Sequence, residues 1–269
     1  MDNRPIGIFD SGLGGLTTLK RITELLPGES IIYLGDTGRI PYGSRSKETI
    51  LKYTSQDANF LVEFDIKAMV VACNTACSVA YEMLEKAYDM PVYEVVSAPA
   101  KAAVEQTINK KVGVIGTTAT IRSGAYESAL KINSPDLTVY SMACPLFVPL
   151  VEEGWITPVD KAALIIAERY LEKLREFKID TLILGCTHYP LLREVISKVI
   201  GPGVNIIDSG SETAKLVAAD LQNREMLAAS ETGGKIKYFV TDSVEGFSKL
   251  ASRYLESDVY GMVEQITLE

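Results

Sequence analysis

Three segments of this chain recur, once each and in the same order, in a second part of the sequence. The matched pairs are Arg4–Phe9 with Lys110–Ile115, the apolar run ending at Cys73 with the run ending at Cys186, and Glu94–Lys101 with Asp208–Lys215. The two cysteines lie 113 residues apart, and the other pairs keep nearly the same offset. One such match can arise by chance, but three in order indicate an internal duplication. We therefore expect two similar halves.

Each half has the pattern of an α/β unit. Short runs rich in Val and Ile alternate with longer segments of helical period, which is typical of parallel strands joined by crossover helices. Strands are predicted near Ile6–Phe9, Ile31–Leu34, Ala68–Ala72, Val92–Val95, Val112–Ile115, Leu137–Ser141, Thr181–Leu184 and Val204–Ile207. Among the helices we expect Leu16–Leu26, which ends at Pro27 and Gly28, and Pro158–Phe177, with its proline just inside the start.

The residues from about Ser209 onward add a helix, a strand at Ile236–Val240 and a helix over Val244–Tyr254. We expect them to pack back on the first half. The predicted fold class is α/β, with two pseudo-symmetric domains whose mainly parallel sheets face each other across a central cleft. The first domain comprises 1–96 plus 209–269, and the second comprises 97–208. Because ligands bind at the carboxyl ends of parallel strands, the site is expected in the cleft.

Composition excludes several classes of protein. Of the 269 residues, 47% are hydrophobic, which supports a sizeable core, and the net charge of −8 without a basic cluster argues against nucleic acid as a partner. No apolar run approaches the roughly 20 residues of a membrane span, and the N-terminus lacks a signal-peptide pattern. We expect a cytoplasmic protein with no membrane partner. Its four cysteines are too sparse for a disulfide framework and are expected as free thiols.

Cys73 and Cys186 are the strongest functional candidates. Each closes an apolar run, at a predicted strand end just before a helix N-terminus, where the helix dipole favours the thiolate over the reference pKa of about 8.5. A cysteine in an apolar strand is more often structural, and Cys77 and Cys144 fit that interpretation. Two thiols on facing halves suit inversion of a carbon centre, because a base must act on one face and an acid on the other. The pair favours a racemase.

The loop Asp10–Gly15 follows the first strand and opens the first helix. Asp36 stands at about the distance of a ribose ligand, but Thr17 occupies the third glycine position of G-x-G-x-x-G, and the P-loop pattern also fails. Either the loop amides hold a small carboxylate while Asp10 reaches the cleft as a hydrogen-bonding or proton-handling group, or Asp10 is a helix N-cap.

Other candidates follow strand ends. His188 is the only histidine and lies two residues after Cys186, so any role it has is tied to that thiol. Small hydroxyl and amide groups that could bind an α-amino group and two carboxylates, or simply form turns, occur at Pro41–Gly43, Thr117, Thr118 and Thr120. Glu152 and Glu153 either face the cleft or form a solvated helix end.

Zinc is the main alternative for the thiols. Cys73 and Cys77 have zinc-ligand spacing, and Cys186 with His188 could complete a site. The duplication, however, explains Cys73 and Cys186 without Cys77. We therefore predict no metal, and because no lysine is marked for a pyridoxal Schiff base, no cofactor.

The chain resembles the glutamate racemases, cofactor-independent bacterial enzymes of the aspartate/glutamate racemase superfamily that supply D-glutamate for peptidoglycan. The resemblance covers nearly the whole length and is carried by Ile8–Leu16, Pro41–Gly43, Ala72–Ala76 and Leu184–Leu191, in the family's order. Aspartate racemases usually carry an acidic residue where His188 stands, so the string Cys-Thr-His-Tyr-Pro favours glutamate over that alternative and over other cysteine-pair racemases of the superfamily.

The resemblance implies that Cys73 and Cys186 are the proton donor and acceptor pair, that Cys73 deprotonates D-glutamate and Cys186 L-glutamate, and that Asp10 and His188 assist. Glu152 is added as a further catalytic candidate. The predicted substrate-binding residues are Asp10, Ser11, Tyr42, Gly43, Asn74, Thr75, Thr117, Thr187 and His188. L- and D-glutamate are the expected partners, and a homodimer is possible. A thiol hydrolase or lyase, a two-lobed amino-acid binding protein and a zinc protein remain as alternatives.

Overall fold

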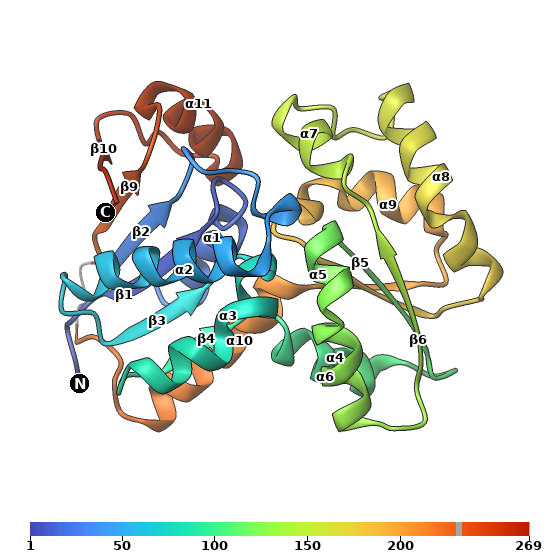
Figure 1. Cartoon of the computed structure of the whole chain (residues 1–269), viewed down its shortest axis with the longest axis horizontal. Helices are drawn as coiled ribbons and strands as arrows, with labels where there is room; N and C mark the ends of the chain where they lie inside the picture. The colour runs from blue at the N-terminus through green and yellow to red at the C-terminus, as the bar shows by residue number, and fades with distance from the viewer. Residues whose placement is uncertain (230–232, 269) are drawn as a thin grey trace.

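The computed structural model describes residues 1–229 and 233–268, in which two parallel β-sheets are flanked by helices (Figure 1). The first sheet has the strand order β10-β9-β2-β1-β3-β4, and the second has the order β6-β5-β7-β8. The first sheet consists of β1 (Ile6–Asp10), β2 (Ile31–Gly35), β3 (Ala68–Val71), β4 (Val92–Glu94), β9 (Ile236–Val240) and β10 (Val263–Gln265). The second consists of β5 (Lys111–Gly116), β6 (Thr138–Ala143), β7 (Thr181–Gly185) and β8 (Asn205–Asp208).

The strand order confirms two duplicated α/β halves. The order β2-β1-β3-β4 in the first sheet equals β6-β5-β7-β8 in the second, and β9 and β10 extend the first sheet beyond β2. The two halves also share individual hydrogen bonds. Glu94 and Asp208 end corresponding strands, and each accepts hydrogen bonds from the backbone N–H groups two and three residues later. The residues that follow corresponding strands therefore lie at corresponding positions in the two halves.

The helices are α1 (Leu16–Leu25), α2 (Lys47–Val62), α3 (Asn74–Ala87), α4 (Ser97–Gln106), α5 (Thr118–Ser123), α6 (Ala125–Asn133), α7 (Phe147–Glu152), α8 (Lys161–Glu176), α9 (Arg193–Ile200), α10 (Ser209–Asn223) and α11 (Val244–Leu255). Two 3₁₀ turns, η1 (Tyr42–Ser44) and η2 (Tyr189–Leu192), follow β2 and β7. None of the helices among the described residues is both long enough and apolar enough to cross a membrane.

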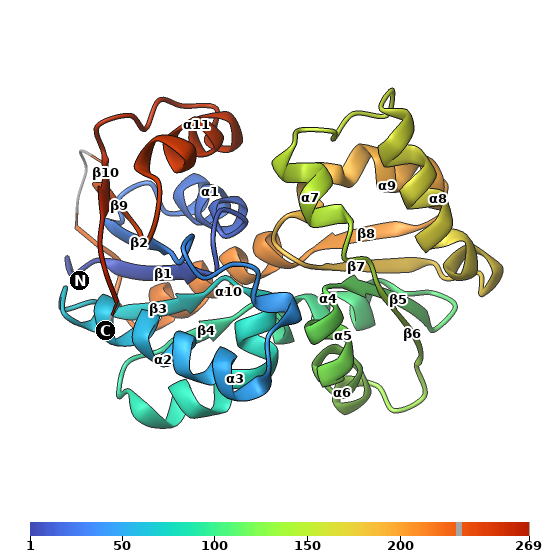
Figure 2. The same ribbon diagram turned by 45° about the horizontal axis from the view of Figure 1, so that its top comes forward.

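Two helices carry the chain between the halves. Helix α4 follows β4 of the first sheet but packs on α6 and β7, whereas α10 follows β8 of the second sheet but packs on α1 and β4. Figure 2 shows α10 in the half that contains β1, and α4 in the half that contains β5. The first sheet thus takes its strands from both ends of the chain. The domain limits stay a prediction, and residues 230–232 and 269 of the predicted first domain lie outside the described residues.

The burial pattern explains why these segments form these elements. Strands β1, β2, β3 and β7 are buried along their whole length, as expected for parallel strands covered on both faces. Helix α8 buries Ala163, Ala167, Leu171 and Leu174, which share one face at helical spacing.

The predicted helix start at Pro158 is wrong. Asp160 accepts hydrogen bonds from the backbone N–H and hydroxyl of Thr157 and returns its own N–H to the Thr157 carbonyl, which closes a turn in front of the helix. Pro158 lies inside that turn, and α8 begins at Lys161. The short strand β10 was not predicted, because three residues carry too little periodicity to be recognised.

Candidate active site

A cavity of about 260 Å³ lies between the halves, at the carboxyl ends of both sets of strands. Its walls come from both halves, which confirms the predicted central cleft. The predicted site residues that line it are Ser11, Tyr42, Gly43, Cys73, Asn74, Thr75, Thr117, Glu152, Cys186, Thr187 and His188. Asp10 does not line it, and neither do the candidates Thr120 and Glu153.

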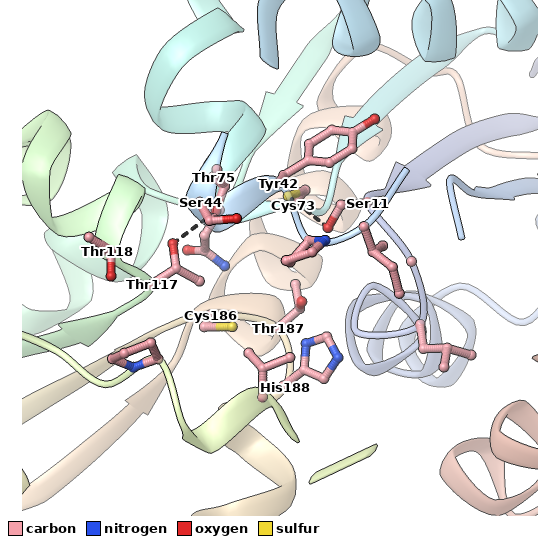
Figure 3. A pocket seen from close by; sticks show the side chains of 18 of the residues that line it. Ser11, Tyr42, Ser44, Cys73, Thr75, Thr117, Thr118, Cys186, Thr187 and His188 are labelled. Atoms are coloured by element: carbon pink, nitrogen blue, oxygen red, sulfur yellow. Dashed lines mark hydrogen bonds between the residues drawn. The ribbon is translucent and has the colours of Figure 1, made fainter. Parts of the chain in front are cut away.

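The two candidate thiols face this cavity from opposite halves. Cys73 follows β3 and Cys186 follows β7, and both are about 95% buried. Figure 3 shows them on facing walls, with Ser11 beside Cys73 and with Thr187 and His188 beside Cys186. Cys77 and Cys144 are also buried free thiols, but neither lines the cavity. Cys77 donates to the Val71 carbonyl, which fits its predicted structural role.

Only one of the two thiols precedes an α-helix directly. Cys73 is the N-cap of α3 and accepts from the N–H of Ala76, as predicted. For Cys186 the prediction is wrong, because η2 follows it and α9 begins only at Arg193. Pro190 sits in the first turn of η2, where the chain closes with i→i+3 bonds before the helix starts.

The amide at the helix N-terminus favours the thiolate of Cys73, as predicted, because it lowers the pKa of that thiol, but the net shift is upward. Burial raises the pKa of Cys73, and the nearby Asp10 carboxyl raises it further, to about 12. Hydrogen bonds from Ser11 and the Ala76 N–H act in the opposite direction but do not outweigh burial. Burial and the Asp10 carboxyl thus favour the thiol form of Cys73 over its thiolate.

Asp10 lies behind the wall of the cavity. It is 1% exposed, and it accepts a hydrogen bond of 2.9 Å from the Gly12 N–H, so this loop amide is already occupied. Burial raises the pKa of Asp10, although neighbouring His188 and backbone N–H groups lower it. The N-cap of α1 is Gly15, so the N-cap interpretation of Asp10 is wrong. Its closest link across the cleft is Thr187, whose hydroxyl lies 3.5 Å from its carboxylate.

His188 and Glu152 form a charged pair next to Cys186. The Nε2 atom of His188 lies 3.4 Å from Oε1 of Glu152 on α7, without a hydrogen bond to any described residue. Burial lowers the pKa of His188, but the Cys186 thiol and the Glu152 carboxylate raise it, and the net value is about 10. Cys186 and Glu152 thus favour the protonated form of His188 beside the thiol.

The Tyr42 hydroxyl is turned away from the cavity. It donates to the carboxylates of Asp36 and Asp57, and Arg39 bonds to the same two carboxylates at 2.6 and 2.8 Å. Figure 3 shows the Tyr42 ring directed out of the site. This buried network fixes the turn at Pro41–Gly43, so Tyr42 presents its backbone to the cavity. The carboxylate of Asp36 is bonded within this network and does not line the cavity.

Threonine hydroxyls connect the halves along one wall. Thr75 at the start of α3 lies 3.0 Å from Thr117 and 3.3 Å from Thr120, measured between hydroxyl oxygens, and these two lie 3.0 Å from each other. Thr117 caps α5, and Thr118 lines the cavity beside it. The cluster joins the first half to the second at the site.

Sequence reasoning missed part of the wall. Pro145, Val148 and Pro149, in and before α7, line the cavity and make it partly apolar. The duplication contained the signal that could have found them. Strand β6 corresponds to β2, and the turn after β2 was predicted in the site, so the segment after β6 belongs there too.

Gly14 was also missed. A Cβ atom at this position would overlap the Thr187 hydroxyl and lie 2.6 Å from Nδ1 of His188. The loop of the first half therefore approaches the Cys186 segment as closely as a glycine allows.

The zinc alternative finds no support in the positions of the thiols. Among residues 1–229 and 233–268, no group of three or more His, Cys, Asp or Glu side chains is arranged to hold a metal ion.

Comparison with known proteins agrees with this geometry. The glutamate racemase of Geobacter metallireducens is 48% identical over 99% of this chain and 97% of its own length. The crystal structure of glutamate racemase isoform RacE1 from Bacillus anthracis has a TM-score of 0.95 at 41% identity, covering 100% of this chain and 99% of the other. That of the Francisella tularensis enzyme in complex with D-glutamate has a TM-score of 0.93 at 37% identity, with coverage of 100% and 99%.

More distant structures share only the fold. Aspartate racemase from Picrophilus torridus is 19% identical, with a TM-score of 0.59, and the match covers 83% of this chain and all of the other. The family model for Asp/Glu/hydantoin racemases matches residues 7–217. The predicted resemblance is confirmed, and this chain belongs to the Asp/Glu/hydantoin racemase family.

Proposed function

We propose that this protein interconverts L- and D-glutamate by a two-thiol proton transfer that uses no cofactor, and that it supplies D-glutamate for peptidoglycan. The observation that carries the proposal is the pair Cys73 and Cys186, which reach one cavity from corresponding strand ends in opposite halves. A base and an acid on opposite faces of the α-carbon are what inversion requires.

The choice of glutamate as substrate rests on the relatives. Proteins named glutamate racemase match nearly the full length at 45–48% identity, and solved relatives are described in complex with D-glutamate and with L-glutamate. Aspartate racemases resemble the chain only distantly. Aspartate racemisation is the second candidate and the natural control substrate.

In the proposed reaction, the thiolate on one face takes the α-proton and becomes a thiol, while the thiol on the other face gives its proton to the carbanion and becomes a thiolate. Cys73 is the base for D-glutamate and Cys186 for L-glutamate. Each turnover leaves the two groups in exchanged protonation states. In each turnover one sulfur gains a proton from the α-carbon and the other loses one to it, so the overall reaction is balanced.

The carbanion needs stabilisation from the protein itself. Hydrogen-bond donors fixed where charge develops lower the barrier most in a site closed to water. We assign substrate binding to the donors of the cavity wall: Ser11, Asn74, Thr75, Thr117 and Thr187 through their side chains, and Tyr42 and Gly43 through the backbone.

The groups behind the thiols differ between the halves. We propose that His188, with its pKa of about 10, delivers a proton to Cys186 or takes one from it, and that Glu152 holds the imidazole in its charged form. Asp10 acts on the Cys73 side through its charge, since it lies behind the wall and raises the pKa of that thiol.

We further propose that the domain limits lie at 96/97 and 208/209, where α4 and α10 begin on the opposite half from the strands they follow. A homodimer and a cytoplasmic location complete the proposal. Size-exclusion chromatography with light scattering tests the dimer.

Exchange of the α-hydrogen in deuterium oxide tests the function. Incubated with L- or D-glutamate, the protein is expected to incorporate one deuterium at the α-carbon and to form the other enantiomer, as detected by proton NMR and circular dichroism. Aspartate should exchange far more slowly. Binding without exchange would identify an amino-acid binding protein, and cleavage products would identify a hydrolase or lyase.

Glu152→Gln should move the alkaline limb of the activity profile to lower pH. His188 loses its proton as pH rises through about 10, and activity that needs the imidazolium is lost there. Removing the Glu152 carboxylate removes one cause of the raised pKa, so the loss sets in at a lower pH. The measurement is kcat against pH between 7 and 11. Glu153→Gln is the matched control, because Glu153 is exposed and does not line the cavity. If the alkaline loss of activity in Glu152→Gln occurs at the same pH as in the parent, the proposed interaction between Glu152 and His188 is contradicted.

A further inference from the structure

Tyr126 is a buried residue that touches the site from behind without lining the cavity. It lies on α6 in the second half and is 2% exposed. Its hydroxyl is 2.5 Å from Oδ1 of Asn74 and 2.7 Å from the carbonyl oxygen of Val95, both in the first half. One hydroxyl therefore ties α6 to the start of α3 and to the segment that leads from β4 into α4.

Asn74 is the cavity-lining residue that Tyr126 contacts. It follows Cys73 directly, lines the cavity and is 2% exposed. Its Nδ2 atom is buried and has no hydrogen-bond partner among the described residues. An amide NH₂ buried without an acceptor is destabilising, so such a group normally serves a partner that the protein does not itself supply.

The contact with Tyr126 selects the orientation of the amide. The Tyr126 hydroxyl has one proton and faces two acceptor oxygens, Oδ1 of Asn74 and the carbonyl oxygen of Val95, between which it shares that proton, and the amide oxygen of Asn74 is the end that faces Tyr126. Oxygen and nitrogen lie on opposite sides of the amide carbon, which leaves the NH₂ group free to serve the cavity. Without Tyr126, the side-chain amide of Asn74 would have no hydrogen-bond partner among the described residues at either end, so its two orientations would differ little.

We propose that Tyr126 is a positioning residue, which holds the Asn74 amide so that Nδ2 donates a hydrogen bond to a carboxylate oxygen of the amino-acid substrate. This inference rests on the proposed function for the identity of the substrate. Because Tyr126 also bonds Val95, the orientation of Asn74 depends on how the two halves are docked. Tyr126 of the second half thus orients Asn74, a substrate-binding residue of the first half.

Tyr126→Phe tests the proposal, because it keeps the ring and removes only the hydroxyl. The Asn74 amide then loses the bond that orients it, and we expect KM for both enantiomers to rise about tenfold, equivalent to about 1.4 kcal/mol. The kcat values should change less than about threefold, because the lost interaction is made with the bound substrate and the transition state alike.

The matched control is Tyr93→Phe. The Tyr93 hydroxyl donates to Asp220 at 2.7 Å, away from the cavity, so this variant also loses one tyrosine hydrogen bond. Its KM values should equal those of the parent. A similar rise in both variants would show a general effect of lost stability and overturn the positioning role.

A double-mutant cycle with Asn74→Ala separates positioning from packing. If Tyr126 acts through Asn74, then Tyr126→Phe should raise KM less than twofold once Asn74 is alanine. The same tenfold rise in both backgrounds, or no rise in the parent, overturns the inference. Calorimetric binding of D-glutamate to the same four proteins, each also carrying Cys73→Ala so that the ligand is not racemised, gives the cycle without turnover. Absence of α-hydrogen exchange in the parent would refute the proposed function, while the binding cycle would still decide the role of Tyr126.

Discussion

Cys73→Ala and Cys186→Ala are each expected to lower glutamate racemisation by about 10⁴-fold in both directions, at the upper end of what a positioned acid or base contributes. Each variant lacks the only thiol on one face of the cavity, so the α-carbon can be deprotonated or protonated from one side only. Racemisation followed by circular dichroism, started from either enantiomer, measures the loss.

The chain provides matched controls for this result. Cys77→Ala and Cys144→Ala remove buried thiols of the same kind that do not line the cavity, and both should stay active. Loss of one buried sulfur costs on the order of 1 kcal/mol in any of the four variants. The melting temperature should therefore fall by only about 2–4 °C, the shift that 1 kcal/mol causes in a protein of about 150–250 residues. Full turnover by either Cys73→Ala or Cys186→Ala would refute the two-thiol mechanism.

His188→Asn is expected to lower kcat/KM by about 10²-fold, the lower end of the range for a positioned acid or base. Asparagine keeps a polar group near Cys186 but cannot carry the proton that His188 holds up to a pH of about 10. The enantiomers have equal free energy in water, so kcat/KM must fall equally in both directions. The difference between directions appears in kcat, which should fall more for L-glutamate, where Cys186 is the base.

Initial rates at saturating L- and D-glutamate measure this asymmetry. Glu152→Gln is the comparison variant, since it weakens the charged form of His188 but leaves the imidazole in place. It should show the same preference between directions with a smaller loss. Equal falls in kcat for the two enantiomers in His188→Asn would contradict the assignment of His188 to Cys186.

The duplication and the local motifs were readable from the sequence because both depend on neighbouring residues. Apolar runs of four or five residues define buried strands, and matched runs at Cys73 and Cys186 define matched strand ends. Positions in the cleft follow from this, because the carboxyl ends of parallel strands meet at one edge of each sheet.

The features that escaped prediction depend on residues far apart in the chain. The Tyr42 hydroxyl faces away from the cavity because Asp57 on α2 competes for it. The pKa of Cys73 is raised because burial and Asp10 together outweigh the amide of Ala76 on α3, and burial depends on the folding of the whole chain. Tyr126 carried no signal at all, since nothing local marks a tyrosine that will meet Asn74 across the two halves.

The exchange of α4 and α10 between the halves has a consequence for synthesis on the ribosome. The second sheet, with β5 to β8, is complete once residue 208 has been made, whereas the first sheet lacks β9 and β10 until the chain is nearly finished. Helix α1, made among the earliest residues, waits for α10 to cover it. The half that starts first is therefore finished last, and the nascent first half exposes apolar surface for most of the time that translation takes.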